Sequence, residues 1–585
     1  MIALMLMVPL VIALALVLVL PQGISKFIAM AGALAGLALL PFIGSGTYSV
    51  PWFSSAGLAF GLVTSVSQIN LLLLAMVLGI APLILLYSFG FMDTHSQQRR
   101  FYSEMLAFEA AMVLFAMSGS FITMFIAWEF LSLTSYLLIG FWNEKESANR
   151  AARKAITIVF IGDIAILAAI AVMTGAFGTL TFSGVIAALP GNSAAALVVA
   201  VLLGIAVLTK SAQFPFQEWL TDAMEGPAPV SAFLHSTTMV KAGVFLVMVL
   251  LPIFSSAGIL PVISALSLIT VAVATMNALK EMHVKRVIAY STIQELGLML
   301  FAVASGAVLA GVFLFFAQSF YKALLFFSSG AMMKATGEED IRRISGLRRN
   351  NALYIATLFG VLSLAGFVPF DGFFAGSALG SAFSTNLVYY VVLNVFGILT
   401  SFYMFRWLFF TSRKEASAGT AVGFEMLPRS MVAGAIVLGI AALLASFAFP
   451  YFRYLFEMPY PVYSALGTST ADELVVLALA FAGAVASYAA FRKGLALRSR
   501  AATAIIYSKA LFNGLYDISA AFILGIAAGA ATFEHWLDVG FRGIGMSVYY
   551  SSGFIRRLSY GEINLYVLTL SVATMAMIAL VYFVR

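Results

Sequence analysis

Apolar stretches of about 20 residues recur along almost the whole chain, and this pattern limits its fold more than any other feature. A stretch of that length crosses the hydrocarbon core of a bilayer as one α-helix, which satisfies its own backbone hydrogen bonds. Hydrophobic residues make up 62% of the chain and charged residues 10%, whereas soluble domains carry about 25% charged residues. The mean hydropathy is +1.03. The sequence therefore predicts an all-α polytopic membrane protein.

We predict about sixteen transmembrane helices from these stretches. Met1–Leu20 lacks the basic leader and small-residue cleavage site of a signal peptide, so we interpret it as the first helix. The predicted helices cover residues 1–20, 27–43, 70–91, 103–118, 120–142, 154–174, 195–219, 229–252, 258–279, 287–305, 308–333, 351–370, 386–410, 430–450, 471–491 and 563–584.

The distribution of Lys and Arg predicts the orientation. Loops on one side contain Lys26, Arg99 and Arg100, the basic residues of 145–154, 280–286 and 342–349, Arg413 and Lys414, and those of 492–500. The opposite loops contain no Lys or Arg at 44–69, 175–194, 252–258 and 305–308, and only Arg453 at 451–470. Basic loops face the cytoplasm. We therefore expect a cell-membrane protein with both termini on the outer side.

Residues 493–562 differ from the rest because apolar stretches such as Ile518–Ile526 alternate with spaced charges. We interpret this region as a lateral amphipathic segment along the cytoplasmic face that contacts other subunits. An additional buried span is the alternative.

The composition also excludes several kinds of site. The chain has no cysteine, so it has no Cys-ligated iron–sulfur cluster, disulfide or thiol chemistry. Its four histidines are scattered and predict no metal or haem site. We therefore expect no cofactor in this chain. The net charge of +7 fits basic cytoplasmic loops and does not indicate nucleic-acid binding.

The segment Thr209–Phe245 carries the most unusual chemistry. Lys210 lies inside an apolar stretch, and Pro215 follows where the helix should continue. A proline frees backbone groups, which membrane helices tolerate only inside protein or beside water. A second apolar helix then carries His235 and Lys241. Ionisable groups at this depth are costly and generally mark an ion or proton path, although snorkelling lysines are the alternative.

Seven ionisable residues within predicted spans stand out as candidates: Glu129, Asp163, Lys210, His235, Lys241, Glu295 and Lys322. A Glu129–Lys210 pair would keep both groups charged, and separating them would let either exchange a proton. That exchange is the chemistry of a proton pump. A fixed ion pair that only joins two helices is the alternative.

The spacing of His235 and Lys241 makes a further prediction. Six residues correspond to about 240° of rotation on a regular helix, so the two side chains would not share a face. A π-bulge between them would bring them closer, and such bulges favour functional sites. Ser236, Thr237 and Thr238 add hydroxyl groups. We therefore interpret His235 as part of a hydrated relay rather than as a core histidine.

On these residues the chain resembles the antiporter-like subunits of the respiratory complex I superfamily, especially the largest one and the large subunit of Mrp-type Na⁺/H⁺ antiporters. The resemblance is dense from about residue 95 to residue 375. The strings that carry it are WEFLSLTSYLLIGFW at 128–142, GD at 162–163, KSAQFPFQEWLTDAMEGPAPVSAFLHSTTMVKAG at 210–243, KRVIAYST at 285–292, FYKALLFFSSG at 320–330 and GFVPFDGFF at 366–374.

The resemblance implies two inverted five-helix repeats, helices 4–8 and 9–13, with helices 7 and 12 broken at Pro215 and Pro369. It also implies that Glu129 and Lys210 are the paired groups of helices 5 and 7, that Asp163 modulates them, that His235 and Lys241 lie on helix 8, and that Lys322 is the lysine of helix 11. The expected divisions are helices 1–3 at 1–92, the repeats at 93–255 and 256–412, helices 14–15 at 413–492, the lateral segment at 493–562 and the last helix at 563–585.

Three positions depart from the family pattern. The lysine that ends the helix 12 motif is replaced by Gly376, and Gln318 stands where histidine is frequent. Glu295 is an acid where the family usually has Gln or His. The first repeat therefore has its full set of groups, whereas the second would need a different exit, with Glu295 taking part as a charged group or hydrogen-bonding as a neutral acid.

The resemblance implies an ion-translocating, non-redox membrane subunit of a complex I-like dehydrogenase, hydrogenase or ferredoxin-linked reductase. Its partners would be other membrane subunits, peripheral redox subunits with iron–sulfur clusters, lipid, and H⁺ or Na⁺. The alternatives are a subunit of a stand-alone Mrp-type antiporter and a scaffold subunit with reduced throughput.

Overall fold

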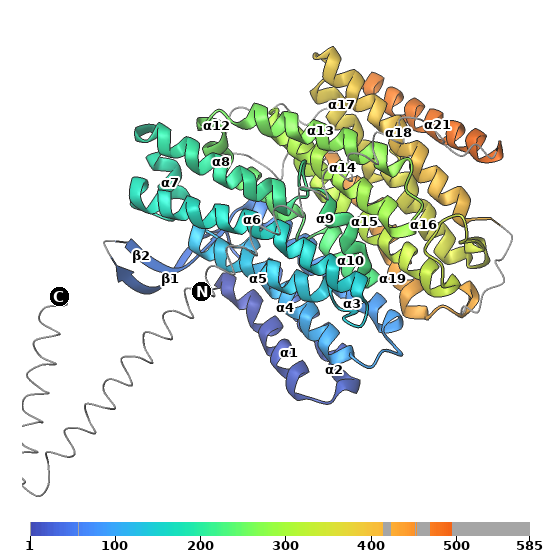
Figure 1. Cartoon of the computed structure of the whole chain (residues 1–585), viewed down its shortest axis with the longest axis horizontal. Helices are drawn as coiled ribbons and strands as arrows, with labels where there is room; N and C mark the ends of the chain where they lie inside the picture. The colour runs from blue at the N-terminus through green and yellow to red at the C-terminus, as the bar shows by residue number, and fades with distance from the viewer. Residues whose placement is uncertain (1, 56–57, 414–422, 451, 453–467, 494–585) are drawn as a thin grey trace, which may run out of the picture. The chain divides into compact units, whose positions relative to one another are not determined.

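The structure is a computed structural model, which describes residues 2–55, 58–413, 423–450, 452 and 468–493. These residues belong to one compact unit, Met1–Lys509, in which the long helices run side by side (Figure 1). In this part of the chain, twelve helical segments are long and apolar enough to cross a membrane. The prediction of a multi-pass, mostly helical membrane protein is confirmed. The lateral segment and the last helix, predicted beyond Lys493, lie outside the described residues.

The helices of the first half of the chain are α1 (Met7–Val19), α2 (Ser25–Leu39), α3 (Gln68–Phe91), α4 (Gln98–Ala116), α5 (Phe121–Ile139), α6 (Glu146–Phe177), α7 (Phe182–Ala188), α8 (Ser193–Lys210), α9 (Glu218–Asp222), α10 (Ala228–Ser236), α11 (Lys241–Val249) and α12 (Leu251–Ser256). The second half contains α13 (Leu260–Ala278), α14 (Val284–Ala304), α15 (Val308–Thr336), α16 (Asn351–Leu364), α17 (Asp371–Ala382), α18 (Leu387–Thr411), α19 (Arg429–Ala445) and α21 (Thr470–Arg492).

One prediction for the N-terminal third is wrong, because the chain is not entirely helical. The expected outer loop at 44–69 forms an antiparallel hairpin of β1 (Gly46–Ser55) and β2 (Leu58–Val66). Ser and Thr alternate there with Tyr and Val, a period-2 pattern that suits a strand. Thr64 pairs with Ser118 in the turn between α4 and α5, so the hairpin is attached to the bundle.

The helix that carries Lys210 ends at that residue instead of running on to 219. Ala212 adopts a left-handed φ of 49°, which residues with a side chain rarely adopt. The Gln213 N–H then reaches back five residues to the Leu208 carbonyl, at 2.8 Å. Helical structure resumes at α9, beyond Pro215. The break therefore leaves Lys210 at a helix end within the bundle.

A second break of the same geometry separates α16 from α17. Gly366, with a φ of 79°, lies three residues before Pro369. Ala212, which is also left-handed, lies three residues before Pro215. The Phe367 N–H again reaches back five residues to its carbonyl partner, at 2.9 Å. The predicted span at 351–370 is therefore shorter, since α16 ends at Leu364, and α17 follows the break. The spans assigned from apolar content did not include this helix, because its six apolar positions are interleaved with Gly and Ser.

Gly372 fixes how closely α17 approaches α16. A Cβ atom at this position would lie 1.9 Å from the backbone carbonyl oxygen of Ser363, whereas one at Gly376 would meet only Val476 Cγ1, at 3.6 Å. We expect Gly372→Ala to lower the free energy of unfolding by about 1–3 kcal/mol, since a backbone must shift to make room.

The matched control for this prediction is Gly376→Ala, one turn further along the same helix. Thermal unfolding of the purified protein in detergent should show a lower midpoint for Gly372→Ala and an unchanged midpoint for the control. Equal midpoints for the two variants would contradict the close packing of α16 on α17.

Candidate functional site

Lys210 is fully buried between α5 and α8. Its Nζ donates to Ser132 Oγ at 2.6 Å and to the Trp128 carbonyl at 3.2 Å. Ser132 Oγ and Trp128 Nε1 in turn donate to the carboxylate of Asp163 on α6, at 3.2 and 2.7 Å. A buried ammonium and a buried carboxylate are thus joined through one hydroxyl group, an arrangement that compensates both charges.

Glu129 lies beside this cluster but is not bonded to Lys210. No ion pair joins the two among the described residues, and the buried Oε1 of Glu129 has no hydrogen-bond partner there. Glu129 does interact electrostatically with both Lys210 and Asp163. The direct Glu129–Lys210 contact is therefore replaced by the Lys210–Ser132–Asp163 chain, and a water-mediated contact stays a prediction.

The helical bonding between His235 and Lys241 is interrupted, as the spacing predicted. α10 ends at Ser236 and α11 begins at Lys241. The Val240 N–H donates to the Leu234 carbonyl six residues earlier, at 3.4 Å, and the Lys241 N–H to Thr238, at 2.9 Å. The departure is larger than the expected π-bulge, since the helix stops and restarts.

His235 is completely buried, and neither ring nitrogen has a hydrogen-bond partner among the described residues. The ring lies 5.8 Å from that of Phe326. The buried hydroxyls of Ser236 and Thr237 are also unpartnered in this part of the chain. A buried polar group without a partner is costly, so this break is where a hydrated path would lower the free energy.

Lys241 bonds to α15, and Lys322, which belongs to α15, bonds to α14. Lys241 Nζ donates to Ser319 Oγ at 2.6 Å and to the carbonyl of Phe315, and lies 4.7 Å above the Phe315 ring. Lys322 Nζ donates to Ser291 Oγ on α14 at 2.5 Å. Both lysines are fully buried.

Glu295 on α14 forms the ion pair of the second half of the site. Its carboxylate lies 2.8 Å from Lys322 Nζ, and Tyr321 Oη donates to its other oxygen at 2.6 Å. Of the two alternatives that the sequence left open, the geometry favours a charged Glu295.

The three buried lysines share one arrangement. Each donates its ammonium group to a serine hydroxyl on a neighbouring helix: Lys210 to Ser132, Lys241 to Ser319 and Lys322 to Ser291. Sequence reasoning did not identify these serines, since serine is common in membrane helices and nothing in its spacing marks a lysine partner.

Of the buried acids that were not singled out from the sequence, two are almost completely inaccessible. Glu109 on α4 is 1% exposed, and Asp371 at the start of α17 is 0% exposed. Glu109 lies inside a predicted span, and Asp371 lies two residues after Pro369 in a string that carries the family resemblance. The signal for both was present, since an acid within an apolar segment is a functional candidate.

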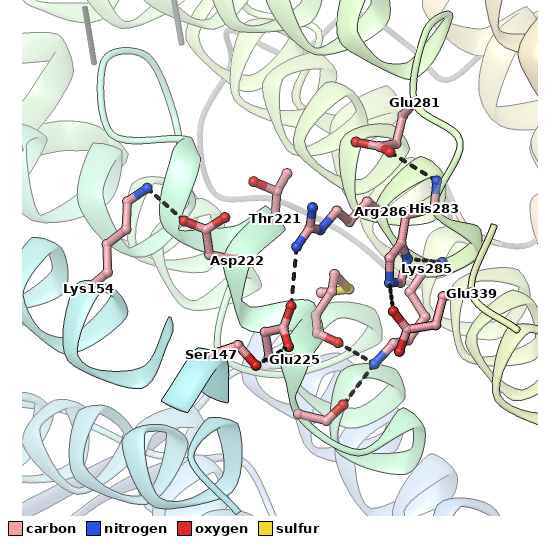
Figure 2. Close-up of polar contacts among 12 residues, drawn as sticks. Ser147, Lys154, Thr221, Asp222, Glu225, Glu281, His283, Lys285, Arg286 and Glu339 are labelled. Atoms are coloured by element: carbon pink, nitrogen blue, oxygen red, sulfur yellow. Dashed lines mark hydrogen bonds and ion pairs between the residues drawn. The ribbon is translucent and has the colours of Figure 1, made fainter. Parts of the chain in front are cut away.

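A cluster of charged residues lies around α9, at the Lys- and Arg-rich ends of α6 and α14 (Figure 2). Lys154 on α6 binds Asp222 at 2.6 Å, and Arg286 on α14 binds Glu225 at 3.2 Å. Ser147 also donates to Glu225, at 2.9 Å. These contacts fix the segment that follows the first break to two long helices.

Lys285 anchors the same segment from α14. Its Nζ, which is almost fully buried, donates to the carbonyls of Met224 and Gly226. A cavity of about 340 Å³ beside it is also lined by His283, Glu339 and Lys334. A cavity of this size has room for several water molecules beside the charged cluster.

His283 Nε2 and Glu339 Oε2 lie 3.1 Å apart at this cavity, a contact that is an ion pair whenever the imidazole is protonated. The hydrogen bond from His283 lowers the pKa of Glu339 from 4.5 to about 2, and the positive charges of His283 and Lys285 contribute further. Because the folded pKa is depressed, this stabilisation is present above pH 4.5 and is lost as the pH falls towards 2.

We expect Glu339→Gln to lower the free energy of unfolding at neutral pH by less than about 1 kcal/mol, since the carboxylate is largely exposed. The difference from the wild type should shrink below pH 4.5 and vanish near pH 2. Thermal unfolding across this range measures it, with Glu146→Gln, in an exposed pair with Arg153, as the control. A difference that is independent of pH would contradict the assignment.

The described residues contain no group of three or more His, Cys, Asp or Glu side chains that could hold a metal ion. The seven ionisable residues predicted from the sequence instead divide into three places. Glu129, Asp163 and Lys210 meet at α5, α6 and α8, His235 and Lys241 flank the break after α10, and Glu295 and Lys322 pair between α14 and α15.

Comparison with known proteins agrees with this arrangement. Residues 118–402 match the family described as NADH:quinone oxidoreductase/Mrp antiporter, TM, and residues 52–102 match the family described as NADH-Ubiquinone oxidoreductase (complex I), chain 5 N-terminus. The first match covers the hairpin's attachment point, both breaks and all seven predicted site residues.

Three curated relatives illustrate the range of similar proteins. NAD(P)H-quinone oxidoreductase subunit 5, organellar chromatophore 1, of Paulinella chromatophora is 36% identical over 62% of this chain and 58% of its own length. NADH-quinone oxidoreductase subunit L of Mycobacterium tuberculosis is 36% identical over 56% of this chain and 53% of its length. Na(+)/H(+) antiporter subunit A1 of Staphylococcus epidermidis is 35% identical over 54% and 42%, respectively.

The match thus spans little more than half the length of the first relatives, and less than half of the antiporter subunit. Among solved structures, the Mrp complex from Dietzia sp. DQ12-45-1b has a similar fold, with a TM-score of 0.71 at 22% identity, over 99% of this chain and 63% of that chain. Residues 118–402 therefore belong to the family described as NADH:quinone oxidoreductase/Mrp antiporter, TM, whose similar proteins include membrane subunits of both kinds.

Proposed function

We propose that this chain is a non-redox membrane subunit that translocates H⁺, Na⁺ or both. The observation that carries the proposal is the set of three fully buried lysines, each bonded to a serine hydroxyl of a neighbouring helix. Buried ammonium groups in a membrane are costly, and a fold keeps them where they exchange protons or ions. The pairing with hydroxyls, rather than with permanent counter-ions alone, leaves each lysine able to change its charge.

The two breaks support an organisation in two repeats, 93–255 and 256–412. In both, a left-handed residue lies three positions before a proline, and the N–H of the next residue reaches back five residues. Broken helices place free backbone groups and helix ends beside a path through the membrane. In this proposal helices 7 and 12 are α8–α9 and α16–α17, and Lys210 and Glu129 belong to the first repeat's path.

The chain would work within a larger assembly. Its relatives are named as subunits of NAD(P)H-quinone oxidoreductases and of an Na(+)/H(+) antiporter. We propose that redox partners with iron–sulfur clusters drive transport through other membrane subunits, and that this subunit holds no cofactor. It would lie in the cell membrane with its Lys- and Arg-rich side in the cytoplasm. That both termini lie outside stays a prediction.

A stand-alone cation/proton antiporter is the second candidate, favoured by the 35% identity to the staphylococcal antiporter subunit. A scaffold with reduced throughput is the third, favoured by the glycine that replaces the lysine at 376. The three differ in partners and in the ion movement they support.

The test is to purify the tagged chain with its native partners, identify the subunits by mass spectrometry, and reconstitute the assembly in proteoliposomes. Ion movement driven by electron transfer, together with iron–sulfur subunits, would support the redox-linked function. Proton movement driven by a Na⁺ gradient, with membrane subunits alone, would support the antiporter. An assembly that moves neither H⁺ nor Na⁺ would overturn the proposed function.

A further inference from the structure

Asp371, the first residue of α17, is completely buried within the second break. Its Oδ1 accepts hydrogen bonds from the Ser363 hydroxyl and from the Gly372 N–H, the latter at 2.9 Å. Its Oδ2 has no hydrogen-bond partner among the described residues. Oδ1 is therefore held by two hydrogen bonds, whereas Oδ2 has no donor among the described residues although it is buried.

A cavity of about 120 Å³ lies between α14, α15, α17, α18 and α21 and is lined by Gly372, the residue that follows Asp371. Gly372, Gly376 and Gly380 line one face of it, at the i, i+4 and i+8 positions of α17. Glu295 and Tyr321 line it from α14 and α15. The residue after Asp371 and the ion-paired Glu295 thus border the same space.

The charged and titratable groups near Asp371 come from two helices. Glu295 and Tyr321 both interact electrostatically with it, and Glu295 is itself paired with Lys322. From α16 only the neutral hydroxyl of Ser363 reaches it. Asp472 on α21 is bonded to Ser381 and Tyr390, near the other end of α17.

The first break has a neutral residue at the position that corresponds to Asp371, and its buried acid, Glu218, follows one residue later. Gln217 lies two residues after Pro215, as Asp371 does after Pro369, and both are almost fully buried. The two breaks have matching backbones, so this difference in side chain is not required by the local fold. At this position, two residues after the proline, only the repeat whose helix has Gly376 carries an acid.

We propose that Asp371 is the terminal proton-accepting residue of the second repeat. A proton leaves the Lys322–Glu295 pair, crosses the cavity and binds Asp371 Oδ2, which neutralises the carboxylate. Its release to the next acceptor restores the charge, and no electron is transferred. The path uses Glu295 as the donor side and needs no lysine at position 376, because the acid at the start of α17 receives the proton instead.

This inference rests on the proposed function, and the experiment separates the two. The complete assembly is reconstituted in proteoliposomes, and proton movement is compared for the wild type, Asp371→Asn and Asp472→Asn. Asparagine keeps the acceptor oxygen for Ser363 and the Gly372 N–H but does not titrate. We expect Asp371→Asn to lose at least about tenfold of the transport rate, and Asp472→Asn, a matched change on α21, to retain it.

Lys210→Ala provides the reference for the proposed function. If the wild type transports and Lys210→Ala does not, while Asp371→Asn transports at the wild-type rate, the inference fails and the proposed function stands. Partial recovery in the double variant Asp371→Asn/Gly376→Lys would support the inference, because the cavity has room for a side chain at 376. Absence of transport in the wild type would overturn the proposed function.

A second readout does not depend on transport. Hydrophobic carbodiimides react with protonated carboxyl groups in apolar surroundings, and mass spectrometry of the purified assembly locates the adduct. We expect an adduct on Asp371 that decreases as the pH rises and is absent from Asp371→Asn. An Asp371 that stays unlabelled at every pH, in an assembly whose other buried acids react, would overturn the inference.

Discussion

Lys210→Ala is expected to abolish ion translocation, with a loss of at least about tenfold, while the assembly still forms. The lysine is fully buried at the end of α8, and its ammonium group donates to Ser132 Oγ and the Trp128 carbonyl. Alanine removes the charge that Ser132 connects to Asp163. Transport in proteoliposomes, normalised to the amount of assembled complex, measures the effect.

Lys493→Ala is the matched control, because this exposed lysine at the end of α21 makes the same chemical change outside the bundle. Blue-native electrophoresis would confirm that both variants assemble. If an assembled Lys210→Ala complex transported at the wild-type rate, the proposed translocation mechanism for the first repeat would be wrong. Glu129→Gln in the same series decides whether the acid that is not bonded to Lys210 is also required.

The sequence could predict the helical architecture because each membrane-spanning helix corresponds to one apolar segment between polar loops. It could also predict the break after Lys210, since Pro215 follows inside the same span. The interruption between His235 and Lys241 was predicted because the two residues are six positions apart. These are local signals. The hairpin at 46–66 was missed because its apolar content satisfied neither a helical period nor the length of a span.

The partners of the buried lysines were harder to predict, because they depend on tertiary packing. Glu129 was the expected partner of Lys210, yet Ser132, one turn later on the same helix, receives the hydrogen bond. Which face of α5 meets α8 is set by how three helices pack, and the apolar sequence of α5 carries almost no amphipathic signal for that face. The sequence could identify acids within the spans but could not predict which side chain bonds to which lysine.

Glu295→Gln is expected to stop transport through the second repeat and to reduce stability at the same time. Glutamine keeps the shape of the side chain and can still accept the hydrogen bond from Tyr321, but it leaves Lys322 buried without the counter-ion that lies 2.8 Å away. Removing one partner of a buried ion pair typically lowers the free energy of unfolding by about 3–5 kcal/mol. The transport loss should be at least about tenfold.

The double variant Glu295→Gln/Lys322→Met separates these two effects. Removing both charges leaves no unpaired ion, so thermal stability should recover towards the wild type, whereas transport should stay lost because neither titratable group remains. Glu144→Gln, on an exposed loop, is the control for the change of Glu to Gln. If Glu295→Gln transported at the wild-type rate, Glu295 would be a structural partner of Lys322 only. If the double variant transported, the second repeat would not carry the ion at all.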